Sequence, residues 1–279
     1  MNKIIIFTLL IFISFISLNA QQRIITAGSS SSEIVCALGD CEKIIATDRT
    51  SLYPEKLQML PSIGYRSNIS AEGIISQNPD LVIFEKEYVK AEVISHLQAT
   101  GIETLVVTQE RTIEGIQKRV EIIAKALNKS KEGKIIISEI KQAFKLLEQK
   151  IELTTSRPSV LCVYARGQGN MQVGGKNSAF NLVELAGAVN AVPEIEGYKP
   201  LNTESLIKAN PDFILFFESG LKSLGGKEKI LEIPGVSETT AGKKVQIISM
   251  NGVFLSNWGP RVAEAAEELF YLTHPEVVK

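Results

Sequence analysis

The sequence predicts an α/β fold of two Rossmann-like lobes joined by one long helix. Apolar, strand-like runs alternate with helix-length segments along the chain, as in parallel sheets with crossover helices. A pattern in the first half recurs in the second, about half a chain later. Between the halves lies an uninterrupted amphipathic segment.

Composition excludes several classes of protein. The chain has 279 residues, 44% hydrophobic and 22% charged, as in an ordinary globular protein. Its 30 basic residues are balanced by 31 acidic ones, so we expect no nucleic-acid partner. The two histidines, His96 and His274, are too few for a histidine-rich zinc site and offer few candidates for a general base.

Residues 1–20 have the layout of a secretory signal peptide. Lys3 precedes an almost unbroken apolar run, and Ala20 precedes a polar segment. A membrane anchor is the alternative, but the apolar run is shorter than the roughly 20 residues of a bilayer span. We predict cleavage near Ala20 and export of the mature protein to the periplasm.

The remaining chain is expected to form three parts. They are an N-terminal α/β lobe at 21–128, a connecting helix at 129–154 and a C-terminal α/β lobe at 155–279. The apolar runs are rich in Ile, Val, Leu and Phe, which is typical of buried parallel strands. Strands are expected at 23–27, 81–84, 104–107, 159–164, 213–217 and 245–249.

An internal repeat indicates that the two lobes are similar. Residues 70–84, SAEGIISQNPDLVIF, resemble residues 202–216, NTESLIKANPDFILF. In each copy an Asn-Pro-Asp sequence ends a helix, because the residue before proline disfavours the helical conformation. A buried strand follows in both copies. Just upstream, Gly64-Tyr65 is matched by Gly197-Tyr198.

The segment at 129–153 is charged, free of proline and apolar on one helical face. A helix of this length spans about 37 Å, more than a crossover within one sheet requires. We expect a rigid strut between the lobes, with a coiled-coil dimer helix as the alternative. The apolar positions are Ile136, Ile140, Phe144, Leu147 and Ile151.

Three cysteines remain in the exported chain. Cys36 and Cys41 lie around the end of a predicted helix, and we expect them to be small buried residues that stay reduced. A local disulfide between them is the alternative. Cys162 lies in a predicted central strand and is expected to be inert.

The motifs favour binding over catalysis. Serines follow Gly28 at the start of a predicted helix, where hydroxyls cap free N–H groups and can also receive a carboxylate or phosphate. The segment GGKNS at 174–178 lacks the P-loop pattern, and no G-x-S-x-G motif occurs. His96, mid-helix, and His274, in the tail, are expected on the surface.

Tyr65 is the leading candidate for a functional side chain. It lies in the loop LPSIGYRSN at 60–68, which we expect at the end of a strand, facing a cleft between the lobes. A packed aromatic side chain is the alternative interpretation.

Several segments carry a resemblance to a known family. They are TSLYP at 50–54, LPSIGY at 60–65, SAEG at 70–73, GYKPL at 197–201, LEIPG at 231–235, TAG at 240–242 and WGPR at 258–261. In this order they resemble the periplasmic haem-binding proteins of bacterial haem-import ABC transporters. The resemblance covers nearly all of the mature chain. Siderophore and cobalamin binders share the architecture.

The resemblance implies that haem b is clamped between the lobes and that no reaction is performed. The family's iron ligand is the tyrosine of the Gly-Tyr motif, which corresponds to Tyr65. Ferric iron and a nearby cation both favour a phenolate, a hard anionic donor. Relatives often have Arg or Lys two residues after this tyrosine. Here that position is Ser67, and the cation is the adjacent Arg66.

The resemblance also implies secondary contacts with haem. Some relatives add a histidine from the second lobe, but here that lobe has only the histidine of the tail. We therefore expect one strong protein ligand and a weaker contact, for which the candidates are Met171, Tyr198 and Arg166. The candidates for binding haem propionates are Arg166, Lys199, Ser29 and Ser30.

Glu72 and Glu204 occupy matching places in the repeat. In this transporter class, one surface glutamate per lobe docks against arginines of the membrane permease, which implies this role for both residues. Both lie near starts of predicted helices, where a carboxylate also interacts favourably with the helix dipole.

The sequence thus predicts a monomeric periplasmic protein that binds haem and delivers it to an ABC permease at the inner membrane. A binder of an iron-siderophore or a corrinoid with the same fold is the alternative. A small cleft enzyme, such as a hydrolase or chelatase, is the alternative of another class, and the lack of an activated nucleophile argues against it.

Overall fold

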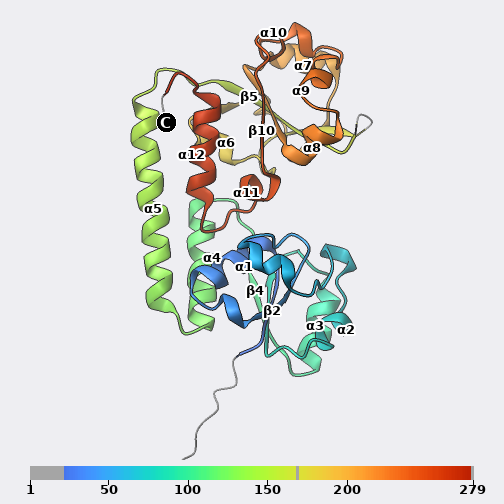
Figure 1. Cartoon of the computed structure of the whole chain (residues 1–279), viewed down its shortest axis with the longest axis vertical. Coiled ribbons are helices and arrows are strands. Elements are labelled where there is room, and N and C mark those ends of the chain that lie inside the picture. Colours follow the sequence, from blue (N-terminus) through green and yellow to red (C-terminus); the bar gives the residue numbers. More distant parts are fainter. Residues whose placement is uncertain (1–21, 168–169, 278–279) are drawn as a thin grey trace, which may run out of the picture.

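The computed structural model describes residues 22–167 and 170–277. The predicted signal peptide at 1–20 lies outside these ranges. Two α/β lobes, each built around its own sheet, lie one above the other, and a long helix runs beside both (Figure 1). The predicted fold class is confirmed.

The first lobe contains a four-stranded parallel sheet in the order β2-β1-β3-β4. Its central strands β1 and β3 are buried along their whole length, as continuous apolar runs require when helices cover both faces. The edge strand β2 was not predicted from the sequence. The strands are β1 Ile24–Ala27, β2 Ile44–Thr47, β3 Leu81–Glu85 and β4 Glu103–Val107.

Helices and short 3₁₀ turns connect these strands. The α-helices are α1 Ser29–Ala37, α2 Ala71–Ile75, α3 Ala91–Ala99 and α4 Ile113–Ala126. The 3₁₀ turns are η1 Cys41–Lys43, η2 Glu55–Met59 and η3 Arg66–Asn68.

The second lobe contains a mixed sheet in the order β10-β9-β5-β6-β8, and β7 pairs with β5. β5, β7, β9 and β10 are parallel, whereas β6 is antiparallel to both β5 and β8. The sequence predicted β5, β9 and β10 but not β6, β7 and β8, which are two to four residues long. The strands are β5 Ser159–Ala165, β6 Met171–Gly174, β7 Val189–Asn190, β8 Tyr198–Pro200, β9 Phe213–Phe217 and β10 Ile247–Met250.

The helices of the second lobe are short, apart from the last. They are α6 Leu182–Leu185, α7 Thr203–Ala209, α8 Glu218–Ser223, α9 Lys227–Leu231, α10 Thr240–Lys243, α11 Gly252–Ser256 and α12 Val262–Thr273, with the 3₁₀ turn η4 Val236–Glu238.

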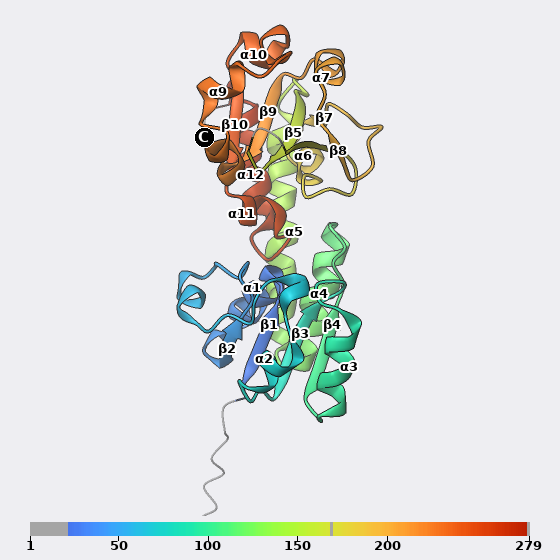
Figure 2. The same cartoon turned by 90° about the vertical axis from the view of Figure 1, so that its right-hand side faces the viewer.

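The long helix α5, Ser130–Glu152, runs along both lobes and packs against α4 and α12 (Figure 2). Every apolar position predicted for its inner face is buried or packed against the core. Gly133 brings α5 close to α4, because a Cβ there would lie 2.6 Å from the Cβ of Ala124. One continuous apolar cluster includes residues of both lobes, α5 and α12, so the lobes share a core.

The internal repeat appears as matching helix–strand units. α2 leads into β3 in the first lobe, and α7 leads into β9 in the second. Asn78 and Asn210 adopt left-handed backbone conformations at the ends of these helices, with φ of 50° and 39°. Asparagine tolerates this conformation, and the following proline prevents the helix from continuing.

Two local predictions were wrong. Cys36 and Cys41 form a disulfide, because the turn from α1 into η1 brings their Cα atoms within 3.9 Å. His274 is buried rather than exposed, and its ring stacks on Phe270 with a centroid separation of 4.6 Å.

Cys162 is a buried free thiol on β5, and burial raises its pKa. No helix within 22–167 and 170–277 is both long and apolar enough to cross a bilayer.

Candidate ligand-binding cleft between the lobes

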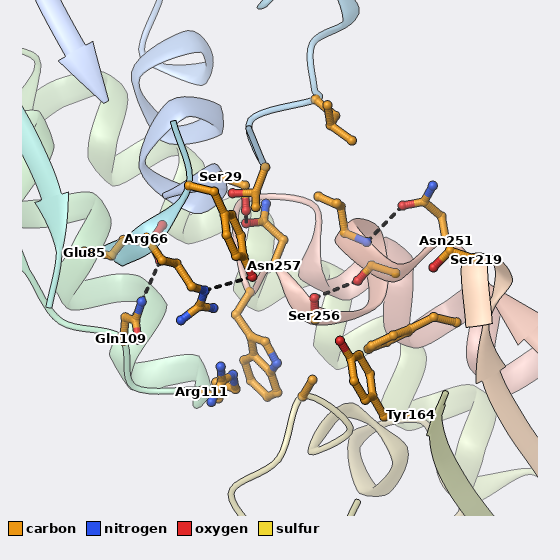
Figure 3. A pocket seen from close by; sticks show the side chains of 18 of the residues that line it. Ser29, Arg66, Glu85, Gln109, Arg111, Tyr164, Ser219, Asn251, Ser256 and Asn257 are labelled. Carbon is orange, nitrogen blue, oxygen red and sulfur yellow. Dashed lines mark hydrogen bonds between the residues drawn. The ribbon is translucent and has the colours of Figure 1, made fainter. Parts of the chain in front are cut away.

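A cavity of about 710 Å³ lies between the two lobes (Figure 3). Its walls include Glu85 at the end of β3, Tyr164 near the end of β5 and Phe217 at the end of β9. The carboxyl ends of parallel strands are where α/β folds place ligands. The carboxyl edges of both sheets therefore face the same space.

Tyr65 and Arg66 form a pair on the wall of the first lobe. Tyr65 is 37% exposed, and Arg66 adopts a left-handed backbone with φ of 45°. Arg66 Nε donates a hydrogen bond to the Tyr65 hydroxyl at 3.1 Å, and its guanidinium lies 5.0 Å from the ring centroid of Tyr88. A donor that carries a positive charge stabilises an anionic oxygen. Arg66 therefore places a positive charge directly beside the Tyr65 hydroxyl.

Tyr88 is held in a different environment from Tyr65. Its hydroxyl donates to Asp48, whose other carboxylate oxygen accepts from the Gly28 N–H at 3.1 Å. Burial raises the pKa of Tyr88, and the Asp48 charge raises it further. Tyr88 also lines the cavity, but its hydroxyl is engaged by Asp48 and the residue remains a neutral phenol.

Aromatic side chains form the wall of the second lobe. Tyr164 contacts Tyr198 and Phe217 edge-on, with ring centroids 5.9 and 6.0 Å apart. Phe217 in turn stacks on Phe180 at 4.9 Å. The Tyr198 hydroxyl accepts a hydrogen bond from the Ala179 N–H at 3.0 Å, which fixes the ring. Such a wall suits a flat, largely apolar ligand.

The charge around the cavity is predominantly positive. The charged residues that line it are the arginines Arg66, Arg111, Arg119 and Arg166, and the glutamates Glu85 and Glu218. Glu85 is 9% exposed and accepts hydrogen bonds from the Ser31 N–H and from Gln109. Burial raises the pKa of its carboxyl group, although Arg119 opposes this shift. The excess of arginines favours a ligand that carries negative charge.

Arg119 connects the two lobes. It is 1% exposed, and its guanidinium donates to the carbonyl of Thr108 at 2.7 Å and to the hydroxyl of Ser30 at 2.6 Å. It also donates to the carbonyl of Trp258, from the segment after α11, at 3.0 Å. Ser29 adds a second link, because its hydroxyl donates to Asn257 at 2.6 Å.

The structure brings five of the predicted haem-contacting residues to the cavity wall: Tyr65, Arg66, Ser29, Arg166 and Tyr198. The other three do not line it. Ser30 is fully buried and bonded to Arg119, and Met171 packs against the core of the second lobe. Lys199 is exposed on β8, next to Tyr198, and neighbouring strand residues point to opposite faces.

Sequence reasoning missed several side chains of the cleft, above all Tyr164, Phe217 and Arg111. Each lies just before or just after the boundary of a regular element. The signal that could have found them is the rule that ligands bind beyond the carboxyl ends of parallel strands.

The two surface glutamates occupy equivalent, exposed positions. The side chain of Glu72 is 75% exposed and lies 3.8 Å from His96, and Glu204 is also exposed. The helix caps come from the neighbouring residues: Ser70 accepts from the Gly73 N–H, and Asn202 accepts from the Ser205 N–H. α2 and α7 both lie on the side of the molecule opposite α5 (Figure 1).

Comparison with known proteins identifies the family. The profile described as "Periplasmic binding protein" matches residues 24–253. The chain belongs to this family. Periplasmic binding proteins of this family deliver ligands to ABC permeases and are not enzymes.

A solved structure agrees with this assignment. The apo structure of the periplasmic heme-binding protein of Roseiflexus sp. RS-1 has a TM-score of 0.87 and 32% identity, over 91% of this chain and 98% of that chain. This likeness confirms the predicted resemblance to the periplasmic haem-binding proteins.

Two curated relatives have other names. An uncharacterized ABC transporter substrate-binding lipoprotein of Bacillus subtilis (strain 168) is 24% identical over 92% of this chain and 82% of its own length. A vitamin B12-binding protein of Photorhabdus laumondii is 24% identical over 94% of this chain and 92% of its own length.

Proposed function

We propose that this periplasmic binding protein captures ferric haem in the interlobe cleft, with Tyr65 as the iron ligand. The observation that carries the proposal is the Tyr65–Arg66 pair at the cavity wall, where Arg66 Nε lies 3.1 Å from the Tyr65 hydroxyl oxygen. A tyrosine oxygen is a donor for ferric haem, and the guanidinium beside it stabilises the anionic form.

Three further observations support haem. The aromatic wall around Tyr164 and Phe217 offers a surface for a flat porphyrin ring. The arginines that line the cavity complement the two carboxylates of haem. The structural relative of Roseiflexus sp. RS-1 bears the name of a heme-binding protein.

A corrinoid is the second candidate, because a relative that covers nearly the whole chain is named a vitamin B12-binding protein. The predominantly positive cavity favours haem, which carries two carboxylates, over this alternative.

A titration distinguishes these ligands. We expect hemin added to apo-protein to produce a saturable change in the Soret absorption, with a tyrosinate charge-transfer band, while excess cyanocobalamin or ferric citrate fails to displace it. Bovine serum albumin and buffer serve as references for nonspecific hemin uptake. Displacement of hemin by cyanocobalamin at equal concentration would overturn the assignment.

For delivery, we propose that Glu72 and Glu204 dock against arginines of the permease. They are exposed, lie one in each lobe, and their helices are capped by other side chains. A single exposed ion pair contributes about 0–1 kcal/mol, so the two pairs must act together or exclude water. We propose that the protein acts as a monomer in the periplasm, because one chain presents both glutamates.

Charge reversal tests docking. We expect Glu72→Arg/Glu204→Arg to retain hemin binding and to lose most haem uptake through the cognate transporter, because like charges then face each other. The matched control is Glu121→Arg/Glu238→Arg, which reverses two other exposed carboxylates, one in each lobe. Uptake by the docking variant equal to that of the control, at matched protein levels, would exclude this role.

A further inference from the structure

Arg111 differs from the other arginines of the cleft. It is half-buried, and within 22–167 and 170–277 it has no hydrogen bond, ion pair or ring contact. By contrast, Arg66 bonds Tyr65, Arg119 bonds several carbonyls, and the exposed Arg166 lies over the Tyr164 ring. A half-buried cation without a counter-charge is unfavourable. A ligand that carries a negative charge could supply the partner that Arg111 lacks.

The surroundings of Arg111 add to this positive potential. Arg111 precedes α4 by two residues, and the start of a helix carries the positive end of its dipole. The side chain of Thr112 accepts from the Gly115 N–H at 2.9 Å, which satisfies one of the N–H groups that a helix leaves unpaired at its start. Burial is the largest cause that lowers the pKa of the Arg119 guanidinium, and the nearby charge of Arg111 lowers it further.

A second cavity, of about 490 Å³, adjoins this position. It lies between the start of α4 and the segment that leads into α6. Arg111 and Trp258 line both this side cavity and the main cleft, so they mark the junction between the two. Figure 3 shows Arg111 at the wall of the cleft formed by the first lobe.

Trp258 supplies an independent observation. It is 3% exposed, and its buried indole Nε1 has no hydrogen-bond partner among the described residues. Its carbonyl is held by Arg119 and Ser30, and its φ is 52°, so the backbone at this residue is fixed in the left-handed region. A buried N–H donor without an acceptor costs about 1–3 kcal/mol, which an incoming acceptor would recover.

The other charges of the side cavity limit where an anion can bind. Lys176 adds a positive charge, but Glu114 and Glu184 add two negative ones. The lining of the side cavity is therefore balanced overall, and the unpaired positive potential is concentrated at the junction, at Arg111.

We propose that Arg111, Trp258 Nε1 and the start of α4 form a carboxylate subsite, which binds one acidic substituent of the cleft ligand. This inference rests on the proposed function, in which the ligand is haem and the substituent is a propionate. The guanidinium pairs with the carboxylate in the bidentate manner, and the indole N–H donates to one of its oxygens. The subsite thereby sets the rotation of the porphyrin about the Tyr65–iron axis.

Esterified hemin provides the test, because it keeps the iron and the ring but lacks both carboxylates. We expect the wild-type protein to bind hemin at least about tenfold more tightly than hemin dimethyl ester, as for the loss of a charge-assisted pair. Arg111→Gln and Trp258→Phe should each weaken hemin binding while leaving the ester nearly unaffected. The matched control is Lys118→Gln, which removes the same charge from an exposed position on α4.

The outcomes separate the subsite from the proposed function. Equal affinity of the wild-type protein for hemin and its ester would overturn the subsite and leave haem binding intact. An undiminished preference for hemin in Arg111→Gln would also overturn it, and would place the carboxylates at other arginines. Failure of both porphyrins to bind the wild-type protein would instead overturn the proposed function. Circular dichroism of each variant verifies that it is folded.

Discussion

Tyr65→Phe is expected to weaken hemin binding roughly a hundredfold, about 2.7 kcal/mol, and to abolish the tyrosinate charge-transfer band. The substitution keeps the ring and removes the oxygen next to Arg66 Nε, so it leaves no cavity behind. Folding should be unchanged, because Tyr65 is 37% exposed and its hydroxyl accepts a hydrogen bond from its neighbour Arg66 in the same loop. Absorption titration of the purified apo-variant measures the effect.

Substitutions of two other tyrosines serve as controls for this prediction. Tyr53→Phe removes a hydroxyl from a half-exposed ring that stacks on Arg261 and does not line the cavity, so hemin binding should be unaltered. Tyr164→Phe removes the phenol of the opposite wall, and the charge-transfer band should persist. An unaltered band in Tyr65→Phe, or its loss in Tyr164→Phe alone, would refute the assignment of Tyr65 as the iron ligand.

Arg119→Ala is expected to lower the free energy of unfolding by about 3–5 kcal/mol, the range for breaking a buried charge pair. The side chain is 1% exposed and bonds Thr108 and Ser30. Its loss leaves the Trp258 carbonyl with one donor fewer and the buried carboxyl of Glu85 without its compensating charge. Urea denaturation of the apo-protein at neutral pH provides the measurement.

Lys118→Ala is the matched control for this prediction. Lys118 is exposed on the same helix and pairs with Glu110 at 3.4 Å, so its removal should change stability by no more than about 0.5 kcal/mol. Arg119→Lys keeps the charge but not the planar fork, and its stability should lie between those of Arg119→Ala and the wild type. A loss below about 1 kcal/mol in Arg119→Ala would contradict the proposed role of this residue in joining the lobes.

Much of the architecture could be predicted from local patterns. Continuous apolar runs predicted β3 and β5, and helical periodicity predicted the inner face of α5. The repeated Asn-Pro-Asp ends of α2 and α7 predicted two similar lobes. The short strands β6, β7 and β8 carry too few residues for a period to be recognised.

Some residues of the candidate site could likewise be identified from the sequence, and others only from the tertiary structure. The sequence alone determined the fold class. The resemblance of its Gly-Tyr motif to the haem-binding family singled out Tyr65, with Arg66 next to it. Tertiary structure decided that Tyr164, Phe217 and Arg111 face the same cavity. Those residues are far apart in the chain, and they meet only because both sheets direct their strand ends into one cleft.

Tertiary structure also decided the partners of side chains whose partners the sequence did not determine. Ser30 is buried and does not line the cleft, because its hydroxyl is bonded to Arg119 and to the Trp258 carbonyl at the junction of the lobes. Cys36 and Cys41 pair because the end of α1 turns directly into η1. The physical reason is general: periodicity encodes which face of an element is apolar. The direction and partner of a polar side chain depend on groups brought close only by packing.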